Sequence, residues 1–415
     1  VFAAGGAKQL DVEITWRNGK RSLVKDAKPN SVCEIDEASA VEVQSPESDV
    51  QSGNAARSPD GGERKDQRAG APDHPSRSTL HAPPLFEDVS GRLNHIHVDA
   101  PFDDFARQPL LPRKLSTLGP GVCWADVDGD GCDDLLVGGG KTGRLGVFRG
   151  DGKGGFAEWK GAPGSVSNPR DQTSVLAGWG VDGLPHVLIG ESNWEDADTN
   201  SPAFRILPLQ SSATTNSPTT FKSQHSATGP LALADVDGDG DLDLFLGGRV
   251  TAGRYPEPAS SHFLRNERGA YSVAQSLPKL GLVSGAVFTD FDGDGDPDLA
   301  LACEWGAIRL FRNNAGRFTE WDPAVRWRNS PSPNAPRSTL SALTGFWNGM
   351  AVGDFDGDGR LDLVASNWGR NWRTDGPAAV ESPVHLLYGD FADRGIVETV
   401  LASADAQLSK VTPWR

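Results

Sequence analysis

The chain has 415 residues, enough for two or three domains of roughly 150 residues and for a sizeable hydrophobic core. It carries 40 Lys and Arg against 56 Asp and Glu, and the formal net charge of −16 repels nucleic-acid phosphates and anionic lipid headgroups, which disfavours nucleic-acid and membrane-surface roles. The 49 Gly, 29 Pro and 12 Trp, with a single Met, favour tight turns and β-structure over a helical bundle.

Two further features of the chain concern its context. No apolar run approaches about 18 residues, so no membrane insertion is expected, and a chain that opens on Val1 without a leader pattern is expected to be processed or partial. The four cysteines match no zinc or redox motif. Cys123 and Cys132 flank one acidic loop, where the sequence favours two free thiols and leaves a disulfide open.

Residues 1–37 are predicted to form a small β unit. Apolar residues alternate with polar ones from Leu10 to Trp16, as in a half-buried strand, and Asn18-Gly19 suits a tight hairpin turn. Residues 38–84 are rich in Ser, Pro, Gly, Asp and Arg and poor in bulky apolar residues, so they are predicted to be a disordered linker. The remaining residues, 85–415, are predicted to form the main domain.

An internal repeat in residues 85–415 is the most informative feature. Four segments, 125–138, 234–247, 289–302 and 353–366, read D-x-D-G-D-G-x-x-D followed by an apolar run. A fifth copy at 177–190 has Gly178, Gly180 and His186 in place of Asp, and a sixth, eroded copy starts at Asp390. In these five copies the first position of the motif falls at 126, 178, 235, 290 and 354, a spacing that suits one four-stranded antiparallel unit per repeat.

The acidic loops are predicted to bind calcium. Carboxylates at positions 1, 3, 5 and 9 and the backbone carbonyl at position 7 converge on one point, and an oxygen-only ligand set of this density suits Ca²⁺. We expect about four ions, one in each complete loop. The expected carboxylate ligands are Asp126, Asp128, Asp130 and Asp134; Asp235, Asp237, Asp239 and Asp243; Asp290, Asp292, Asp294 and Asp298; and Asp354, Asp356, Asp358 and Asp362. The expected carbonyl ligands belong to Cys132, Asp241, Asp296 and Arg360.

Two other interpretations of the loops are weaker. An EF-hand requires a Glu at position 12 and flanking helices, whereas position 12 here is Val137, Leu246, Leu301 or Ala365 within a strand-like run. Asp-Gly pairs can simply make turns, but four complete copies favour calcium. Carboxylates that hold a structural ion are not expected to act in catalysis.

These residues resemble the FG-GAP/VCBS repeat proteins, a family of calcium-loop β-propellers that includes the head of integrin α subunits. The resemblance covers residues 85–415 and implies an all-β, calcium-stabilised propeller of six or seven blades, not necessarily complete in this chain. The N-terminal pattern from Leu10 to Trp16, with Asn18-Gly19, resembles the closing part of an ASPIC/UnbV domain, so the small β unit is expected to be a remnant of one.

A ligand-binding surface is predicted on the propeller face opposite the calcium loops, because segments that follow the second strand of each repeat meet there. The alternative is that these side chains pack and pair among themselves. The expected ligand-binding residues are Arg249, Arg254, Tyr255, Glu304, Trp305, Trp368 and Arg370.

The sequence therefore predicts a binding, adhesion or assembly module with a protein or glycan partner, self-assembly included. Acidic loops of this kind suit millimolar calcium, which places the protein outside the cytoplasm, at a cell surface or in the periplasm. No catalytic motif is recognised. The alternatives are a glycosidase or lyase using Glu304, Asp375 or Glu191, and a purely architectural module.

Overall fold

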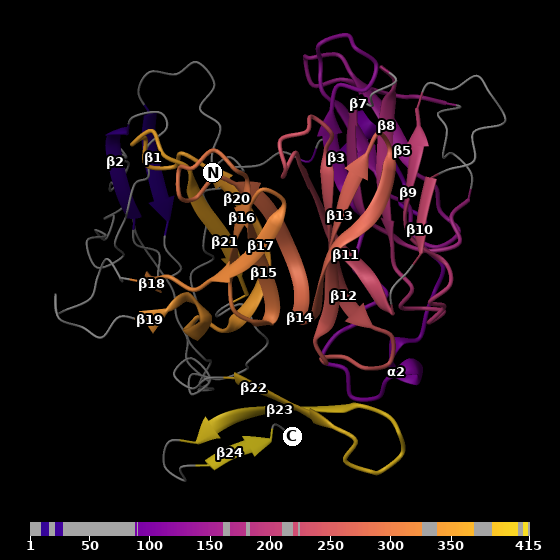
Figure 1. Ribbon diagram of the computed structural model, residues 1–415, viewed down its shortest axis with the longest axis vertical. Coiled ribbons are helices and arrows are strands. Elements are labelled where there is room, and N and C mark those ends of the chain that lie inside the picture. Colours follow the sequence, from indigo (N-terminus) through magenta and orange to yellow (C-terminus); the bar gives the residue numbers. More distant parts are fainter. Residues whose placement is uncertain are drawn as a thin grey trace, which may run out of the picture. The chain divides into compact units, whose positions relative to one another are not determined.

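The computed structural model describes residues 10–15, 21–27, 88, 90–160, 167–179, 183–209, 219–222, 225–325, 338–368, 384–405 and 410–413. Contacts divide the chain into two compact units, Val1–Asp88 with Phe355–Asp358, and Val89–Asp354 with Gly359–Arg415. In the first unit, β1 (Leu10–Thr15) and β2 (Arg21–Ala27) form an antiparallel pair (Figure 1). The linker predicted at 38–84 lies outside the described residues.

The second unit is almost entirely antiparallel β-structure, which confirms the predicted all-β, propeller-like fold. The first sheet contains β3 (Val122–Ala125), β4 (Asp134–Val137), β5 (Gly146–Gly150) and β6 (Phe156–Glu158). The second contains β7 (Gln172–Trp179), β8 (Pro185–Glu191), β9 (Pro202–Pro208) and β10 (Thr219–Lys222). In both sheets the strands pair in chain order, so each repeat forms one four-stranded unit.

The third and fourth repeats share a strand. Their strands are β11 (Ser226–Ala234), β12 (Asp243–Thr251), β13 (Ala259–Glu267), β14 (Ala270–Thr289), β15 (Asp298–Gly306), β16 (Arg309–Asn314) and β17 (Arg317–Trp321). The first part of β14 pairs with β13, and its second part pairs with β15. The change of sheet falls at Gly281, whose φ of 145° is a conformation that favours glycine.

The remaining elements are shorter. They are α1 (Ser90–Leu93), α2 (Asp104–Arg107), β18 (Ala324–Val325), β19 (Ser338–Thr339), η2 (Leu340–Ala342), β20 (Gly345–Gly353), β21 (Asp362–Asn367), β22 (Val384–Gly389), β23 (Glu398–Asp405) and β24 (Lys410–Pro413). β20 pairs with β21 and with the end of β15, while β22, β23 and β24 form a three-stranded sheet. Within the described segments, no helix is long and apolar enough to cross a lipid bilayer.

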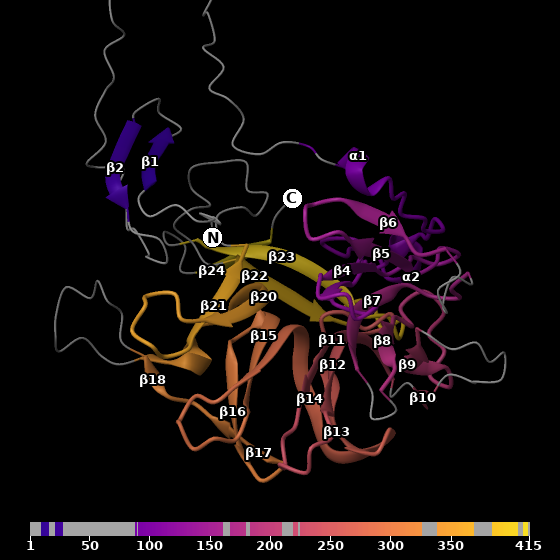
Figure 2. The same cartoon turned by 90° about the horizontal axis from the view of Figure 1, so that it is seen from above.

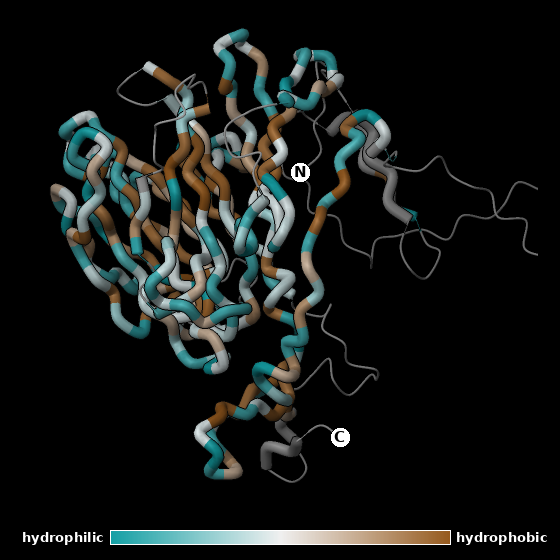
Figure 3. The backbone as a smooth tube through the Cα atoms, turned by 90° about the vertical axis from the view of Figure 1, so that its right-hand side faces the viewer, coloured by the Kyte–Doolittle hydropathy of each residue, from teal (hydrophilic) through white to brown (hydrophobic). Residues whose placement is uncertain are grey.

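The apolar run after each acidic loop forms the second strand of its sheet. β4, β12 and β15 are buried along nearly their whole length. Neighbouring sheets cover β12 and β15 on both faces, whereas Leu135 and Val137 of β4 pack on one side against Leu93 and Phe156. Between the third and fourth sheets, Phe263 stacks on Phe318 with ring centroids 3.7 Å apart. Figure 3 shows hydrophobic stretches along the strands of the second unit and hydrophilic residues at the connecting loops.

The first strands of successive sheets lie against one another, in the order β3, β7, β11, β14 and β20 (Figure 2). Two glycines permit this close approach. A Cβ on Gly121 would lie 2.7 Å from the backbone of Ser174, and one on Gly285 would lie 3.0 Å from Gly349. Inner strands that meet in this way are typical of a propeller.

A segment before the first repeat, residues 98–118, covers the strand ends opposite the acidic loops. The buried Asp104 accepts hydrogen bonds from the backbone of Leu115 and Ser116 and, at 2.8 Å, from Trp194 Nε1. Gln108 Nε2 donates to Tyr255 O at 2.5 Å and to Val397 O at 2.8 Å. The segment therefore joins the second and third repeats to the last sheet.

Candidate metal loops and the paired cluster opposite them

All four complete acidic loops join the first strand of a repeat to its second. They connect β3 to β4, β11 to β12, β14 to β15, and β20 to β21. This is the strand–loop–strand setting predicted from the sequence, and not the helix–loop–helix of an EF-hand.

The aspartate at position 1 organises the turn. Asp126 Oδ1 accepts a hydrogen bond from the Gly129 N–H at 2.7 Å, and Oδ2 accepts one from Gly131 at 2.9 Å. Both glycines have positive φ, 81° and 86°, as this turn requires. The Gly129 hydrogen bond is the main reason that the pKa of Asp126 lies below its ordinary value. Asp235 and Asp290 accept the equivalent pair of bonds.

Three carboxylates gather in each loop, with ligand oxygens within 4.8 Å of one another. The groups are Asp126, Asp128 and Asp134; Asp235, Asp237 and Asp239; Asp290, Asp292 and Asp294; and Asp354, Asp356 and Asp362. The donor set is oxygen only, which fits a hard cation such as Ca²⁺. The other predicted carboxylates, Asp130, Asp243, Asp298 and Asp358, lie outside these groups.

The aspartate at position 9 also has a structural role that the sequence did not indicate. Asp298 is 1% exposed and accepts hydrogen bonds from Asn313 N at 2.8 Å and Phe291 N at 3.1 Å. Asp134 and Asp243 make the same two kinds of contact. Burial raises the pKa of Asp298 despite these bonds. In these three loops, position 9 thus ties the loop to the third strand of its own sheet.

At position 7 the backbone N–H of Cys132 donates to Asp130 Oδ1 at 2.8 Å, and Asp241 and Asp296 donate in the same way to the position-5 carboxylate. Arg360 occupies this position in the fourth loop. Cys123 and Cys132 are both free thiols, which agrees with the interpretation that the sequence favours.

Sequence reasoning missed a set of arginines that pair with the position-3 aspartates. Arg265 NH2 lies 2.8 Å from Asp237 Oδ2. Equivalent pairs join Arg149 to Asp128 at 3.2 Å and Arg312 to Asp292 at 3.3 Å. Each arginine follows Phe or Leu on the third strand of its sheet. This recurrent dipeptide is the feature of the sequence from which the ion pairs could have been predicted. One positive charge therefore stands beside the carboxylates in each of these three loops.

The two incomplete copies keep part of this architecture. In the second repeat, Gly178 pairs with His186 across β7 and β8, while residues 180–182 lie outside the described part of the chain. The sixth copy lies between β22 and β23, and Asp390 accepts hydrogen bonds from Arg394 N at 2.8 Å and Gly395 N at 2.6 Å. The strand–loop–strand unit persists where the acidic ligand set does not.

Four of the residues predicted to bind a ligand come together at the opposite strand ends. Tyr255 OH donates to Glu304 Oε1 at 2.6 Å, and Trp305 Nε1 donates to Tyr255 OH at 2.6 Å. Glu304 Oε2 forms ion pairs with Arg249 and with Arg113, which the sequence prediction did not include. Burial would raise the pKa of Glu304, but the two guanidinium groups and the Tyr255 hydroxyl hold it below its ordinary value.

The other predicted ligand residues lie apart from this network or beside it. Trp368 stacks on Phe346 with centroids 4.4 Å apart, and Arg113 lies over both rings. Arg254 was expected in the cluster and instead pairs with Glu257 at 2.5 Å as a half-exposed local ion pair. Arg370 lies outside the described residues. Tyr255, Glu304 and Arg249 are buried, so the side chains that meet here are mostly internal partners of one another.

Of the carboxylates considered for catalysis, Glu304 is ion-paired as described. Glu191 Oε1 lies 2.8 Å from Arg205 Nε, and burial raises the pKa of Glu191. Asp375 lies outside the described residues.

A cavity of about 460 Å³ lies along the first strands. Its lining includes Thr173, Thr228, Ser284, Asn348, Arg113 and Arg249. Hydroxyl, amide and guanidinium groups from several sheets therefore line one open pocket, which suits a polar or anionic group.

Comparison with known families finds an FG-GAP-like repeat at residues 290–365, which include the third and fourth acidic loops. Nothing is found for an ASPIC/UnbV domain. No curated protein matches the chain. An FG-GAP-like repeat on a propeller-like fold is typical of binding or adhesion modules.

Among solved structures, the chain is similar to BBS1N in complex with ARL6DN, in crystals soaked with mercury and with lead. The mercury-soaked structure has 12% identity and a TM-score of 0.35, over 59% of this chain and 57% of that chain. The lead-soaked one has 11% identity and a TM-score of 0.34, over 60% and 64%. The chain thus spans less than two thirds of the length of either.

Proposed function

We propose that this protein is a calcium-loaded, propeller-like binding module that acts outside the cytoplasm on a protein or glycan partner and catalyses no reaction. The observation that carries the proposal is the recurrence of the carboxylate groups. Four loops at equivalent places in their repeats each gather three carboxylates within 4.8 Å. A turn made only by Asp-Gly pairs would not need side-chain oxygens to converge in this way.

Calcium is the cation that best fits these groups. Carboxylate and carbonyl oxygens supply a hard ligand set, and a flexible loop of this kind accommodates the six to eight ligands of Ca²⁺ better than the strict octahedron of Mg²⁺. Four bound ions carry eight positive charges, so the net charge would rise from −16 to −8. Exposed loops with one arginine already beside the carboxylates suit weak, millimolar binding, which is available outside the cytoplasm.

The partner would bind on the side opposite the acidic loops. The axial cavity of about 460 Å³ and the side chain of Arg113, 21% exposed, offer a cationic, hydrogen-bonding surface there. A carboxylate of a protein or an acidic sugar would complement it. Arg254, Trp305 and Trp368 border this side as further expected contacts, and self-assembly through it is included in the proposal.

Equilibrium dialysis of the full chain against calcium tests the central claim. We expect Asp290→Asn to lose one bound ion relative to the unchanged chain, because Asp290 belongs to a complete group. Asp182→Asn is the matched control. Its repeat has Gly178, Gly180 and His186 where the complete copies have aspartates, so it should bind no ion. A chain that binds no calcium at millimolar concentration, or an Asp182→Asn variant that loses an ion, would refute the proposal.

A further inference from the structure

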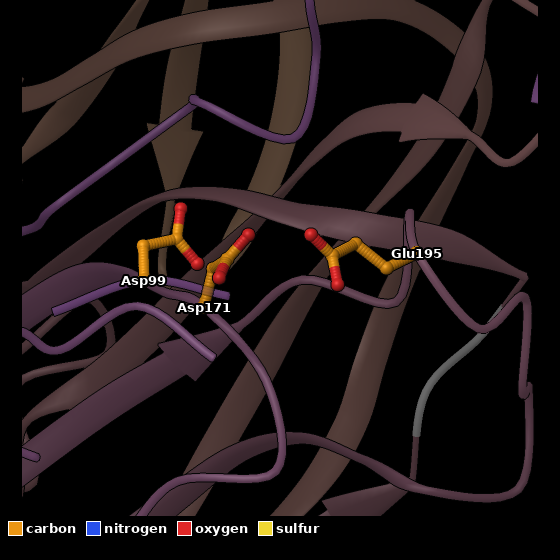
Figure 4. A group of neighbouring side chains, drawn as sticks. All are labelled: Asp99, Asp171 and Glu195. Carbon is orange, nitrogen blue, oxygen red and sulfur yellow. The ribbon is translucent and has the colours of Figure 1, made fainter. Parts of the chain in front are cut away.

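A second kind of acidic cluster lies at the strand ends opposite the repeat loops. Asp99 precedes the first sheet, Asp171 immediately precedes β7, and Glu195 follows β8 (Figure 4). Their ligand oxygens lie within 4.8 Å of one another. In Figure 4 the Glu195 side chain extends toward Asp171, and Asp99 approaches Asp171 from the other side. No part of the D-x-D-G-D-G pattern contributes to this cluster.

The backbone holds these three residues in place. The Lys141 N–H donates to both Asp171 Oδ1 at 2.8 Å and Asp99 Oδ1 at 3.1 Å, so one donor holds two carboxylates together. Ser192 N donates to Asp171 O at 3.0 Å, which fixes the loop that leads to Glu195. A Cβ on Gly140 would lie 2.5 Å from the Asp99 Cβ, so only glycine fits there. The cluster is therefore built into three connected segments.

Glu195 is the observation that points to a ligand. Its side chain is 8% exposed, and within the described part of the chain neither carboxylate oxygen has a hydrogen-bond partner. Its ion pair among the described residues joins Oε2 to Lys141 Nζ at 3.0 Å. A buried carboxylate without hydrogen bonds is costly, and a single ion pair with a part-exposed lysine offsets only part of the desolvation of its charge.

The charges in the cluster do not balance. Within the described part of the chain, three carboxylates face one ammonium group, that of Lys141, which is 39% exposed and forms its ion pair with Glu195. Arg107 donates to the Glu195 backbone carbonyl at 2.7 Å and not to its carboxylate. The cluster thus keeps two negative charges more than positive ones, the amount that one divalent cation supplies.

We propose that Asp99, Asp171 and Glu195 form a divalent-cation site, separate from the repeat loops, whose ion is Ca²⁺. Three carboxylates offer up to six oxygens, and water can complete the shell of a hard cation. Asp99 is exposed, so the ion enters from the solvent on that side, while the buried Asp171 and the Glu195 side chain, which is 8% exposed, hold it from within. An ion here joins the segment before the first repeat to the second repeat.

The competing arrangement has no metal. Burial, with the neighbouring Asp99 and Glu195 carboxylates contributing, raises the pKa of Asp171 to about 7, so a proton shared between Asp171 and Asp99, together with Lys141, could neutralise the cluster. The two arrangements differ in what they predict for calcium content, which is independent of whether the repeat loops are loaded.

The test is calcium binding by the full chain, with three variants. Glu195→Gln keeps the shape of the side chain and should lose one ion per chain at saturating calcium. Asp196→Asn is the matched control, because it removes the same charge from the next residue, which pairs with Arg170 at 2.7 Å, and should lose none. Lys141→Met removes the competing ammonium group and should tighten one site by about tenfold.

Each outcome decides the proposal. Loss of one ion in Glu195→Gln alone, with a circular dichroism spectrum like that of the unchanged chain, supports it. Equal calcium content in the unchanged chain and Glu195→Gln overturns it. If Glu195→Gln fails to fold, Lys141→Met decides, since unchanged affinity at every site would show that no ion competes with Lys141. Failure of the loop sites would appear separately, because Asp290→Asn and the unchanged chain would then bind the same number of calcium ions.

Discussion

In the third acidic loop, one aspartate holds the fold through hydrogen bonds and another is expected to bind the ion. A pair of substitutions tests whether these two roles are separate. Asp298 is buried and accepts backbone hydrogen bonds from Asn313 and Phe291. Asp294 is exposed, belongs to the carboxylate group, and accepts one hydrogen bond, from Asp296 N at 2.9 Å. The first should act on the fold with or without calcium, and the second only through the ion.

The magnitudes follow from these contacts. Asp298→Ala leaves two backbone N–H donors without their acceptor at about 1–3 kcal/mol each, so the free energy of unfolding should fall by about 2–6 kcal/mol in calcium and in chelator alike. Asp294→Asn keeps an oxygen for the Asp296 N–H. It should therefore match the unchanged chain in chelator and lose up to about 2.7 kcal/mol when calcium is at 100 times its dissociation constant.

Urea unfolding of the full chain, followed by tryptophan fluorescence, measures both quantities in excess calcium and in EGTA. The reasoning fails in two distinguishable ways. An Asp298→Ala variant as stable as the unchanged chain in EGTA would show that the hydrogen bonds at position 9 do not hold the loop. An Asp294→Asn variant that loses the same stability in both conditions would show that Asp294 serves the turn and not an ion.

Two further predictions concern the opposite strand ends and the core. Glu304→Gln leaves Arg249 and Arg113 without a full counter-charge and should cost about 3–5 kcal/mol, whereas Arg254→Ala breaks an exposed pair worth at most about 1 kcal/mol. Because the folded pKa of Glu304 is depressed, its contribution to stability is present above the ordinary Glu pKa and is lost as the pH falls through the lower folded pKa. Urea unfolding at pH 7 and below pH 4 should therefore show less acid destabilisation in Glu304→Gln than in the unchanged chain. Equal acid dependence of the two chains would contradict this assignment. Burial raises the pKa of the Cys303 thiol to about 11, so iodoacetamide at pH 8 should label it only after denaturation, and mass spectrometry that finds native labelling would contradict that burial.

The strand–loop–strand units could be predicted from the sequence because their determinants are local. A glycine-punctuated acidic stretch followed by an apolar run specifies both the turn and the buried strand within about 14 residues, as at Asp290 to Ala302. The repeat then extends the prediction from one unit to the fold. For the same reason the position-1 aspartates and their glycine partners are where the pattern indicates.

The partners that come from distant parts of the chain could not be predicted in this way. Arg113 is 191 residues from Glu304, and nothing near either residue indicates the other. Residues 98–118 were predicted only as part of the main domain, yet they cover Tyr255 and bring Asp99 to Asp171. Such contacts depend on how the sheets stack. The ligand-binding surface predicted from residue types alone is therefore, in the structure, a largely buried network around Glu304.

The eroded repeats show which part of the pattern maintains the fold. β7 and β8 pair along their length although Gly178 and His186 replace two aspartates, because Val175, Val187 and Ile189 still fill the core between the first two sheets. The side chain of Trp179, at the end of β7, reaches the neighbouring repeat, where its Nε1 donates to Asp126 O at 3.2 Å in the first acidic loop. Apolar packing thus preserves the sheet after its own charged loop is lost, and the sheet can then support the loop of the repeat beside it.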